Sequence, residues 1–406
     1  MHWLSVRLSV AAGAALAVVG TLVSPSIAPV TDVADLQLQA STTDEPPHRS
    51  GHHFRRIDPA QHVLARMSLP QRVGQLFMVG SPATSASPAT LRQIGRFHVG
   101  NVMLTGRSHG GVRVPARVAA AMQARATAQA TGHVRLLVST DQEGGQVQVL
   151  QGPGISTIPS ALTQGRWTPR RLVRASGVWA RQLRAAGVNM DLAPVVDTVP
   201  GPAAAAHNPP IGAYDREFGY SPTVVGRHGV AFSRGLASRG VVPTVKHFPG
   251  LGRVHANTDT RVRVTDRVTR RHDPYFTPFR EAVESGVPAV MMSTAYYSRL
   301  DPHNPAAFSP FVIGEVLRGD LGFRGVVISD DLGRARQVSP WSYADRALKF
   351  VRAGGDMVLT VDPATLPAMY TAVLRRARTD RRFRDRVDEA ALRVLELKSD
   401  QHLLGR

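Results

Sequence analysis

Short apolar runs alternate with longer amphipathic stretches along most of the chain. The short runs are rich in β-branched residues and are bounded by glycine, proline or polar residues, a pattern typical of buried strands. Their regular spacing indicates a repeated strand–helix unit. Eight of these runs predict strands, at residues 75–79, 99–105, 134–140, 188–196, 241–247, 289–295, 325–329 and 356–361.

The longer stretches carry apolar residues at helical spacing and predict helices. Many of them end at a glycine, the residue that most often follows a helix. They include residues 112–130, 169–186, 222–238, 274–285 and 341–353. We expect the last stretch, residues 387–397, to pack outside the strands. Eight strand–helix units favour an α/β fold of the (β/α)8 TIM-barrel type, with a doubly wound sheet as the alternative.

Polar and titratable residues gather where the predicted strands end. In a barrel the carboxyl ends of all strands meet at one face, which is where active sites lie. We therefore expect these side chains to share one pocket. They follow the third to the seventh predicted strands: Asp141, Gln142, Glu143, Asp197, Lys246, His247, Ser293, Thr294, Asp330 and Asp331.

The N-terminal residues have the layout of a secretory signal peptide. Arg7 precedes an apolar run over residues 8–23, and small residues follow that run up to Ala28. The run is shorter than the roughly 20 residues that a membrane-spanning helix needs, but an uncleaved N-terminal membrane anchor stays open. We assign residues 1–28 to the signal peptide, 29–58 to a disordered linker and 59–406 to a single folded domain. This organisation predicts a secreted or extracytoplasmic protein.

Composition narrows the available chemistry. The 406 residues contain no cysteine, which excludes disulfides, zinc fingers, iron–sulfur sites and a cysteine nucleophile. The 49 Lys and Arg residues outnumber the 30 Asp and Glu residues, for a formal net charge of +19, yet only Lys246, Lys349 and Lys398 are lysines. Lys246 at a strand end therefore indicates a site that needs a compact ammonium group. No helix-turn-helix or RNA-binding motif accompanies the charge, so we predict no nucleic-acid partner.

The string GVVISDDL brings a buried strand directly to two carboxylates, Asp330 and Asp331. A carboxylate held rigidly at a barrel rim suits a nucleophile that attacks an anomeric carbon. The alternative is a helix N-cap, a role in which aspartate is common, and this motif taken alone favours the cap. In VKHFPGLGRVHANTDT, Lys246 and His247 precede a glycine-rich loop. For His247, a hydrogen-bonded core imidazole is the competing interpretation.

Four segments together resemble a known family. DQEGGQVQ (residues 141–148), GVNMDLAPVVD (187–197), KHFPGLG (246–252) and LGFRGVVISDDL (321–332) resemble, in this order, the barrel domain of glycoside hydrolase family 3. The pattern is similar to that of the family's single-domain bacterial β-N-acetylglucosaminidases, which act on peptidoglycan fragments. This resemblance implies a retaining β-N-acetylhexosaminidase that releases terminal β-linked N-acetylglucosamine through a covalent glycosyl-aspartate intermediate.

The resemblance also assigns roles residue by residue. Asp330 matches the nucleophile, and three residues match those that hold the sugar hydroxyls in the first subsite: Asp141, Lys246 and His247. Arg216, in IGAYDREFG, resembles the arginine of the family's IG-x-RSF segment, with one or two extra residues before it. Asp197 ends a family motif, and it is either a functional residue of that motif or a structural carboxylate that holds the loop after the fourth strand.

The acid/base position departs from the family pattern. Relatives of this type carry an Asp-x-His pair on the loop after KHFPGHG, and its histidine donates the proton. Here Leu251 replaces the second histidine of KHFPGHG, and Asn257-Thr258-Asp259 stands where Asp-Ser-His is expected. The simplest hypothesis gives the proton transfer to Asp259, with Asn257 or His255 orienting it. Two alternatives stay open: a catalytically impaired sugar-binding protein, and a β-glucosidase-like exo-glycosidase of the same family.

These interpretations together define the expected partners. The substrate is a carbohydrate, with peptidoglycan fragments as the expected class, and the resemblance implies neither a cofactor nor a metal. The positive charge of the chain predicts attraction to an anionic cell envelope. Because the sequence shows no obvious exposed apolar stripe, we expect a monomer.

Overall fold

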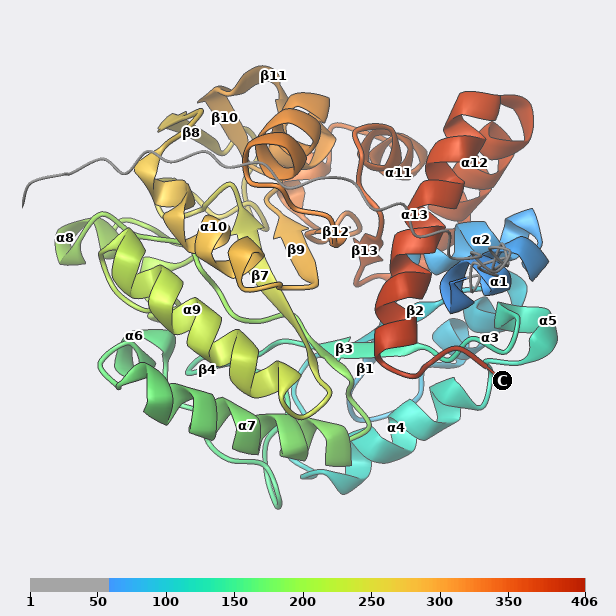
Figure 1. Ribbon diagram of the computed structural model, residues 1–406, viewed down its shortest axis with the longest axis horizontal. Helices are drawn as coiled ribbons and strands as arrows, with labels where there is room; N and C mark the ends of the chain where they lie inside the picture. Colours follow the sequence, from blue (N-terminus) through green and yellow to red (C-terminus); the bar gives the residue numbers. More distant parts are fainter. Residues whose placement is uncertain (1–57, 406) are drawn as a thin grey trace, which may run out of the picture. The chain divides into compact units, whose positions relative to one another are not determined.

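Eight parallel strands form a ring at the centre of the fold (Figure 1). The structure is a computed structural model and describes residues 58–405. Neighbouring strands follow the order β12-β9-β7-β6-β3-β2-β1-β13, and a parallel bridge between Ile328 and Met357 joins the two ends of that order. The predicted (β/α)8 barrel is confirmed, and the doubly wound sheet is wrong. The strands are β1 Phe77–Pro82, β2 Asn101–Thr105, β3 Leu137–Thr140, β6 Met190–Asp191, β7 Val242–Phe248, β9 Ala289–Met292, β12 Val326–Ser329 and β13 Val358–Thr360.

All eight predicted strands exist, although some of their ends differ. Nearly every strand residue is buried, as expected for parallel strands covered on both faces. The first strand begins two residues later than predicted, because Gln75 ends the preceding helix. The fourth, β6, is far shorter than residues 188–196: Pro194 has no N–H to donate, and only isolated bonds, such as Val196 N–H to the oxygen of Lys246, continue the pairing.

Helices connect the strands and surround the ring. A hydroxyl or carboxylate that accepts a hydrogen bond from the first turn fixes the start of several helices: Thr168 caps α7, Ser342 caps α11 and Asp380 caps α13. The helix α7 begins at the predicted residue, whereas α11 begins two residues later than predicted and α13 six residues earlier. The helices are α1 Pro59–Arg66, α2 Leu69–Gln75, α3 Pro88–Arg96, α4 Arg113–Gln123, α5 Ala128–Thr131, α6 Ala161–Gln164, α7 Pro169–Ala185, α8 Pro202–Ala205, α9 Pro222–Ala237, α10 Thr277–Glu284, η4 Phe311–Asp320, α11 Tyr343–Arg352, α12 Leu366–Thr379 and α13 Arg381–Asp400.

One predicted helix, residues 112–130, is two helices. The helix α4 ends at Gln123, and α5 begins again after Thr127, whose side chain accepts the N–H of Ala130. Threonine competes for backbone hydrogen bonds in this way, which favours a new N-cap over a continued helix. The uniform apolar spacing of the stretch concealed this break.

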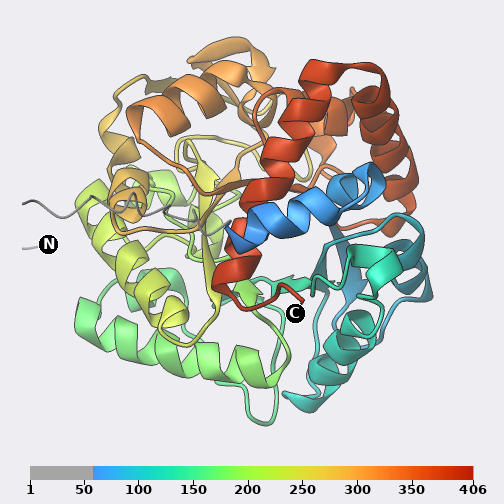
Figure 2. The same cartoon turned by 45° about the vertical axis from the view of Figure 1, so that its right-hand side comes forward.

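The helix α13 closes the amino end of the barrel. Its Val394 and Leu397 pack with interior side chains of the strands, among them Met78 and Met291. Its Lys398 is fully buried and donates to Gln75 Oε1 (2.6 Å) and to the oxygen of Gly100 (2.8 Å), at the starts of β1 and β2. Figure 2 shows α13 crossing beside α1. The predicted stretch at 387–397 thus lies outside the ring but also covers one end of its core.

Two small additional sheets lie at the carboxyl end of the barrel strands. A hairpin of β4 (Gln142–Gly144) and β5 (Val147–Gln148) follows β3, and β8 (Thr265–Arg270) pairs with β10 (Tyr296–Arg299), which pairs with β11 (Asp301–Pro305). No helix among residues 58–405 is long and apolar enough to cross a membrane. The predicted signal peptide or anchor and nearly all of the predicted linker lie outside the described residues.

Because α13 covers one end of the barrel core, shortening the side chain of Leu397 should strongly lower the stability of the fold. This side chain is 5% exposed, so Leu397→Ala should lower the free energy of unfolding by about 2–5 kcal/mol, as buried leucines generally do. Arg381→Ala, an exposed position on the same helix, should change it by less than about 0.5 kcal/mol. Urea unfolding followed by tryptophan fluorescence measures both. Equal effects of the two substitutions would show that α13 contributes nothing to the core.

Candidate active site

A cavity of about 420 Å³ opens at the carboxyl ends of the strands. Four apolar side chains of the barrel contribute to its lining: Met103, Leu192, Met291 and Leu359. The structure also brings most of the predicted site residues to this cavity: Asp141, Arg216, Lys246, His247, Asn257, Asp259 and Asp330. Residues far apart in the sequence thus meet because their strands end at the same face.

Four charged side chains form a network on the cavity wall. Glu143 accepts hydrogen bonds from Arg216 with both oxygens, at 2.8 Å from Nε and 2.7 Å from Nη2. Lys246 Nζ lies 2.7 Å from Glu143 Oε1 and 2.6 Å from Asp141 Oδ1. The side chains of Lys246 and Glu143 are 3% and 4% exposed, whereas that of Asp141 is 24% exposed. Glu143 therefore balances the two buried cations, and Asp141 remains accessible from the cavity.

The network fixes the charge of its members. Burial alone would raise the pKa of Glu143, but the charges of Arg216 and Lys246 lower this pKa to about 2. Burial alone would lower the pKa of Lys246, but the carboxylates of Asp141 and Glu143 raise it above its usual value. Asp191 lies deeper, and burial raises its pKa well above the usual range. At neutral pH Glu143 is therefore ionised, Lys246 is a cation, and Asp191 is held toward its neutral form.

Asp197 orients His247 and holds the strand end. Its Oδ2 accepts from His247 Nδ1 at 2.7 Å, and its Oδ1 accepts the backbone N–H groups of His247 (3.1 Å) and Leu251 (2.7 Å). Asp197 is fully buried. These contacts favour the structural interpretation of Asp197. Because Nδ1 is engaged, Nε2 is the imidazole nitrogen left for a ligand in the cavity.

The two neighbouring aspartates, Asp330 and Asp331, make different contacts in the structure. Asp331 accepts the backbone N–H groups of Gly333 (2.9 Å), Arg334 (2.8 Å) and Val361 (3.0 Å), so it is the residue that caps the turn after β12. Among the described residues, Asp330 accepts only the N–H of Asp331, at 2.8 Å. Both residues line the cavity. The cap interpretation thus applies to Asp331, and the carboxylate of Asp330 is left available to a ligand.

Asp259 lies on the loop between β7 and β8, which we call the acid loop (residues 249–264). Asn257 Oδ1 accepts the N–H of Asp259 at 2.8 Å, so Asn257 shapes the turn that presents Asp259. His255 is exposed and lines a separate hollow, together with Asn208 and Tyr275. Of the two residues predicted to orient Asp259, the structure therefore places only Asn257 beside it.

The acid loop is anchored to the segment that follows Asp330. The N–H of Arg336 donates to the oxygen of Asp259 (3.1 Å), and that of Gln337 donates to the oxygen of Thr258 (2.9 Å). The buried side chain of Gln337 then bonds both backbone groups of Val264, at 2.9 Å through Oε1 and 3.3 Å through Nε2. The carboxylates of Asp259 and Asp330 are therefore held on one connected scaffold.

The other end of the acid loop is anchored to the loop after β6. Asn208 Nδ2 donates to the oxygens of Leu251 and Val254, at 2.8 Å each. Gly252 passes so close that a Cβ atom there would lie 1.8 Å from the oxygen of Thr198. Only glycine fits this approach.

The surroundings of Asp259 favour its protonated form. The residue is exposed at the cavity mouth, but neighbouring protein atoms remove part of the water around its carboxyl group. This partial burial and the nearby charges of Asp330 and Asp331 raise its pKa to about 6, against the opposing effect of His247 and Arg216. Two carboxyl groups at one cavity, one of them with a pKa raised to about 6 and so protonated in mildly acidic solution, can act as a general acid and a nucleophile.

No role was predicted from the sequence for three residues that form the cavity or hold its loop: Glu143, Arg334 and Gln337. Glu143 stands two residues after Asp141 at a strand end, and this position was a usable signal for a buried partner of Lys246. Arg334, which lines the cavity, and Gln337, which anchors the acid loop, follow Asp330 in a segment without any periodicity. Among residues 58–405, no group of three or more His, Asp or Glu side chains is arranged to hold a metal ion.

Comparisons with known proteins agree on one family. A family model described as "Glycosyl hydrolase family 3 N terminal domain" matches residues 68–397. A β-hexosaminidase of Stenotrophomonas maltophilia (strain K279a) is 36% identical over 252 residues, which are 59% of this chain and 71% of that protein. One from Xanthomonas axonopodis pv. citri (strain 306) is 32% identical over 311 residues, 74% of this chain and 88% of that protein.

A solved structure is similar over the whole barrel. The β-N-acetylhexosaminidase of Beutenbergia cavernae DSM 12333 superposes with a TM-score of 0.82 at 50% sequence identity, covering 82% of this chain and 99% of that one. A family 3 β-N-acetylglucosaminidase of Paenibacillus sp. str. FPU-7 gives a TM-score of 0.76 at 32% identity, covering 84% of this chain and 64% of that one.

The charge network predicts a pH-dependent role for Glu143 in stability. Glu143→Gln should lower the free energy of unfolding by roughly 3–5 kcal/mol at pH 7, because the partly buried Arg216 loses the carboxylate it pairs with and the buried Lys246 keeps only Asp141. The folded-state pKa of Glu143 is about 2, below its ordinary 4.5. The stabilisation is therefore complete above pH 4.5 and is lost as the pH falls toward 2.

Unfolding curves of both proteins between pH 3 and 7 measure this difference. The matched control is Glu389→Gln, at a 51% exposed ion pair on α13, which should cost less than about 1 kcal/mol. A difference between wild type and Glu143→Gln that grows on acidification would contradict the assigned charge.

Proposed function

The chain belongs to glycosyl hydrolase family 3 as a β-N-acetylhexosaminidase, and we propose that it works by a retaining mechanism in which Asp330 is the nucleophile and Asp259 the general acid. The observation that carries this proposal is the contrast between the two carboxyl groups. Asp330 ends a buried strand with a single backbone contact among the described residues, whereas Asp259 has its pKa raised to about 6. A retaining glycosidase needs one carboxyl group placed to attack and a second whose raised pKa lets it donate a proton.

The charge network supports binding of the terminal sugar. Asp141 offers an accessible carboxylate, and Lys246 offers the third N–H of an ammonium group whose position two carboxylates fix. His247 presents Nε2, because Asp197 engages Nδ1. Such charge-assisted contacts to sugar hydroxyls are stronger than those between neutral groups, so these residues hold the anomeric carbon over Asp330.

The reaction proceeds in two displacements. The carboxylate of Asp330 attacks the anomeric carbon as the bond to the leaving oxygen breaks, and Asp259 gives its proton to that oxygen. The Asp259 carboxylate then takes a proton from a water molecule, which attacks the same carbon and releases Asp330. The sugar leaves with its original anomeric configuration, because each displacement inverts the carbon once.

We further propose that the leaving group is a muramic-acid residue of a peptidoglycan fragment, handled outside the cytoplasm. Arg334 supports this substrate, because it lines the cavity while its side chain stays 71% exposed. Its nearest carboxylate, on Asp362, is 3.4 Å away, so the guanidinium can turn to an anionic substrate group. Muramic acid carries a lactyl carboxylate beside the scissile bond, and arginine pairs with carboxylates in a bidentate manner.

The role of Asp259 predicts a dependence on the leaving group. Asp259→Asn should lower kcat/KM at least roughly a hundredfold on aryl N-acetylglucosaminides with poor leaving groups, because general acid catalysis is lost. Dinitrophenolate leaves without a proton, so the dinitrophenyl substrate should be cleaved at a near-normal kcat/KM. Wild-type cleavage of the poor substrates should decline above pH 6, where Asp259 loses its proton.

Asp330→Asn is the matched control, because it should abolish cleavage of both substrate types. Equal loss on both substrates in Asp259→Asn would remove Asp259 as the acid. If wild type cleaved neither substrate yet bound the sugar, the chain would be a sugar-binding protein instead.

The role of Arg334 predicts a change confined to one substrate. Arg334→Gln should raise KM roughly tenfold for N-acetylglucosaminyl-N-acetylmuramic acid, because a charge-assisted contact is lost, and leave KM for chitobiose unchanged. Arg336→Gln is the control, since Arg336 is also exposed but does not line the cavity. Equal KM changes on the two disaccharides would count against a muramic-acid leaving group.

A further inference from the structure

The outer surface of the helix pair α7 and α9 carries arginines and no acidic residue. The sequence has no Asp or Glu between Glu143 and Asp191, or between Glu217 and Asp259. These two intervals contain α7 and α9. We call the exposed arginines of this pair and of the turn after α9 the arginine face: Arg170, Arg171, Arg174, Arg181, Arg184, Arg227, Arg234 and Arg239.

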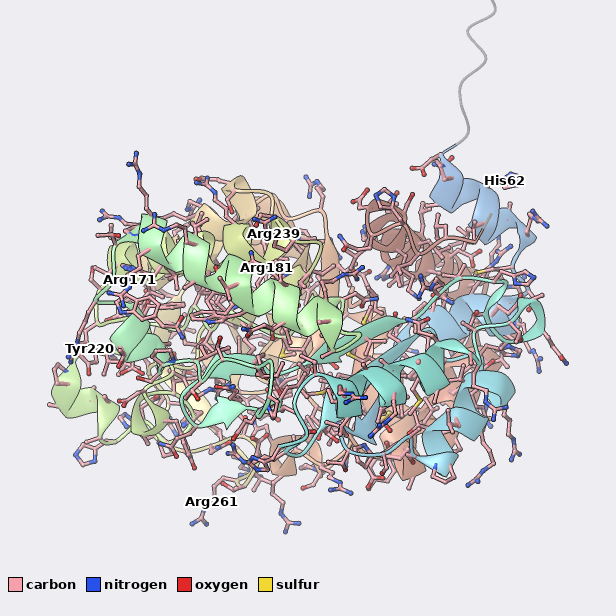
Figure 3. The ribbon with its side chains drawn as sticks, turned by 90° about the horizontal axis from the view of Figure 1, so that it is seen from below. His62, Arg171, Arg181, Tyr220, Arg239 and Arg261 are labelled. Carbon is pink, nitrogen blue, oxygen red and sulfur yellow. The ribbon has the colours of Figure 1, made fainter. Side chains whose placement is uncertain are left out.

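Close packing makes the two helices one rigid surface. Gly235 of α9 lies so near α7 that a Cβ atom there would meet Ser176 Oγ at 1.8 Å. Trp179 of α7 packs against Phe232 of α9, with ring centroids 5.8 Å apart. Figure 3 looks onto this side, with Arg171, Arg181 and Arg239 labelled on it and Arg261 of the acid loop at another edge.

The arginine face is unfavourable for folding. Arg170 and Arg171 lie in the first turn of α7, where no acidic residue offsets the positive end of the helix dipole. Arg170 and Arg174 are four positions apart, and Arg181 and Arg184 are three apart, so like charges adjoin on the helix surface. Each of these features costs helix stability, whereas Arg184 and Arg234 lie in the last turns of α7 and α9, where a cation is favourable.

Arginine-rich composition alone does not explain the pattern. On α12 and α13 the arginines are interspersed with carboxylates: Arg376 pairs with Asp380, Arg386 with Glu389, and Arg393 with Asp356. Among the described residues, none of the eight arginines of the arginine face forms a salt bridge. Arg375, Arg381 and Arg382 of α12 and α13 also form no salt bridge among the described residues, so the difference lies in the acidic residues, which occur along α13 and at its N-cap and are absent from α7 and α9.

A groove marks the border of the arginine face. It has a volume of about 520 Å³ and lies between α7, α9 and α10, with Arg170, Arg227 and Arg234 in its lining and Glu281 and Glu284 on the α10 side. The positive charge of the arginine face does not extend beyond Glu281 and Glu284. A linear anion would therefore follow α7, whose 17 residues extend about 25 Å.

We propose that the arginine face binds a phosphodiester polymer of the cell envelope and retains the enzyme on it. Guanidinium groups hold phosphates in bidentate pairs, and a row of them along a helix matches a chain of regularly spaced phosphates. A lipid surface fits less well, because Val178 is the one large apolar residue exposed on the two helices, and interfacial helices insert aromatic and leucine side chains.

The arginine face is separate from the catalytic cavity, since none of its residues lines that cavity. Binding the polymer therefore leaves the cavity open to a sugar chain. The inference rests on the proposed location outside the cytoplasm but not on which residue donates the proton, and activity on a soluble substrate tests the proposed mechanism independently.

The test is a triple substitution on one stripe of α7: Arg170→Gln, Arg174→Gln and Arg181→Gln in the full chain. Glutamine keeps the helix propensity of arginine. Sedimentation with isolated cell walls that carry phosphodiester polymers should show at least roughly tenfold weaker binding of this variant at low salt. Wild-type binding should weaken as salt is added, and linear polyphosphate should displace wild type from the walls.

The matched control removes the same charge elsewhere, by Arg375→Gln, Arg381→Gln and Arg382→Gln at exposed positions on α12 and α13. It should bind walls like wild type, and kcat/KM on an aryl N-acetylglucosaminide should be unchanged in both variants. Equal weakening in both variants would overturn the arginine face as a specific site. Undiminished binding to walls stripped of phosphodiester polymers, or equally tight binding to phosphatidylglycerol vesicles, would overturn the polymer as its partner.

Discussion

The pairing of one buried carboxylate, Glu143, with two buried cations sets the charge of the whole catalytic cavity. Lys246 and Arg216 lie where water is largely excluded, and each alone would cost several kcal/mol to bury as a charge. Glu143 offsets both, and it does so from the end of a different strand. The pairing also explains the choice of cation. The fork of Arg216 takes both oxygens of Glu143, and the compact ammonium of Lys246 still reaches Asp141.

The proposed assignment of Asp259 as the acid places proton transfer on a carboxyl group. A carboxylic acid is largely ionised at pH 6 unless its surroundings oppose the charge, and here partial burial and the charges of Asp330 and Asp331 raise the pKa of Asp259 to about 6. In the proposed mechanism, Asp330 becomes a neutral ester once it bonds to the sugar. One cause of the raised pKa then disappears, and Asp259 ionises more readily. The group can therefore act as an acid in the first step and as a base in the second.

The sequence predicted the barrel well because its signals are local. Strand and helix periodicity, helix caps and terminal glycines all lie within a few residues of the element that they define. Of the site, the sequence predicted the residues that directly follow a strand, but not the contacts between them. The bond of Gln337 to Val264 joins residues 73 positions apart, and the roles of Asp330 and Asp331 differ only through backbone groups that the sequence does not place. The break after Gln123 was not predicted, because the apolar spacing that indicates a helix continues across it.

The charges of the catalytic cavity and those of the arginine face come from different segments of the chain. Between Asp141 and Asp259 the carboxylates cluster in a few short segments near the cavity, and the intervals between them supply the arginines of α7 and α9. Cavity charges are buried and paired, so salt screens them little, whereas the exposed arginines respond strongly to ionic strength. A first turn of α7 rich in arginine conflicts with the helix dipole, and local conflicts of this kind tend to mark functional positions. Because the two sets of charges face different surroundings, retention on an anionic polymer can be tuned without altering the pKa values that catalysis requires.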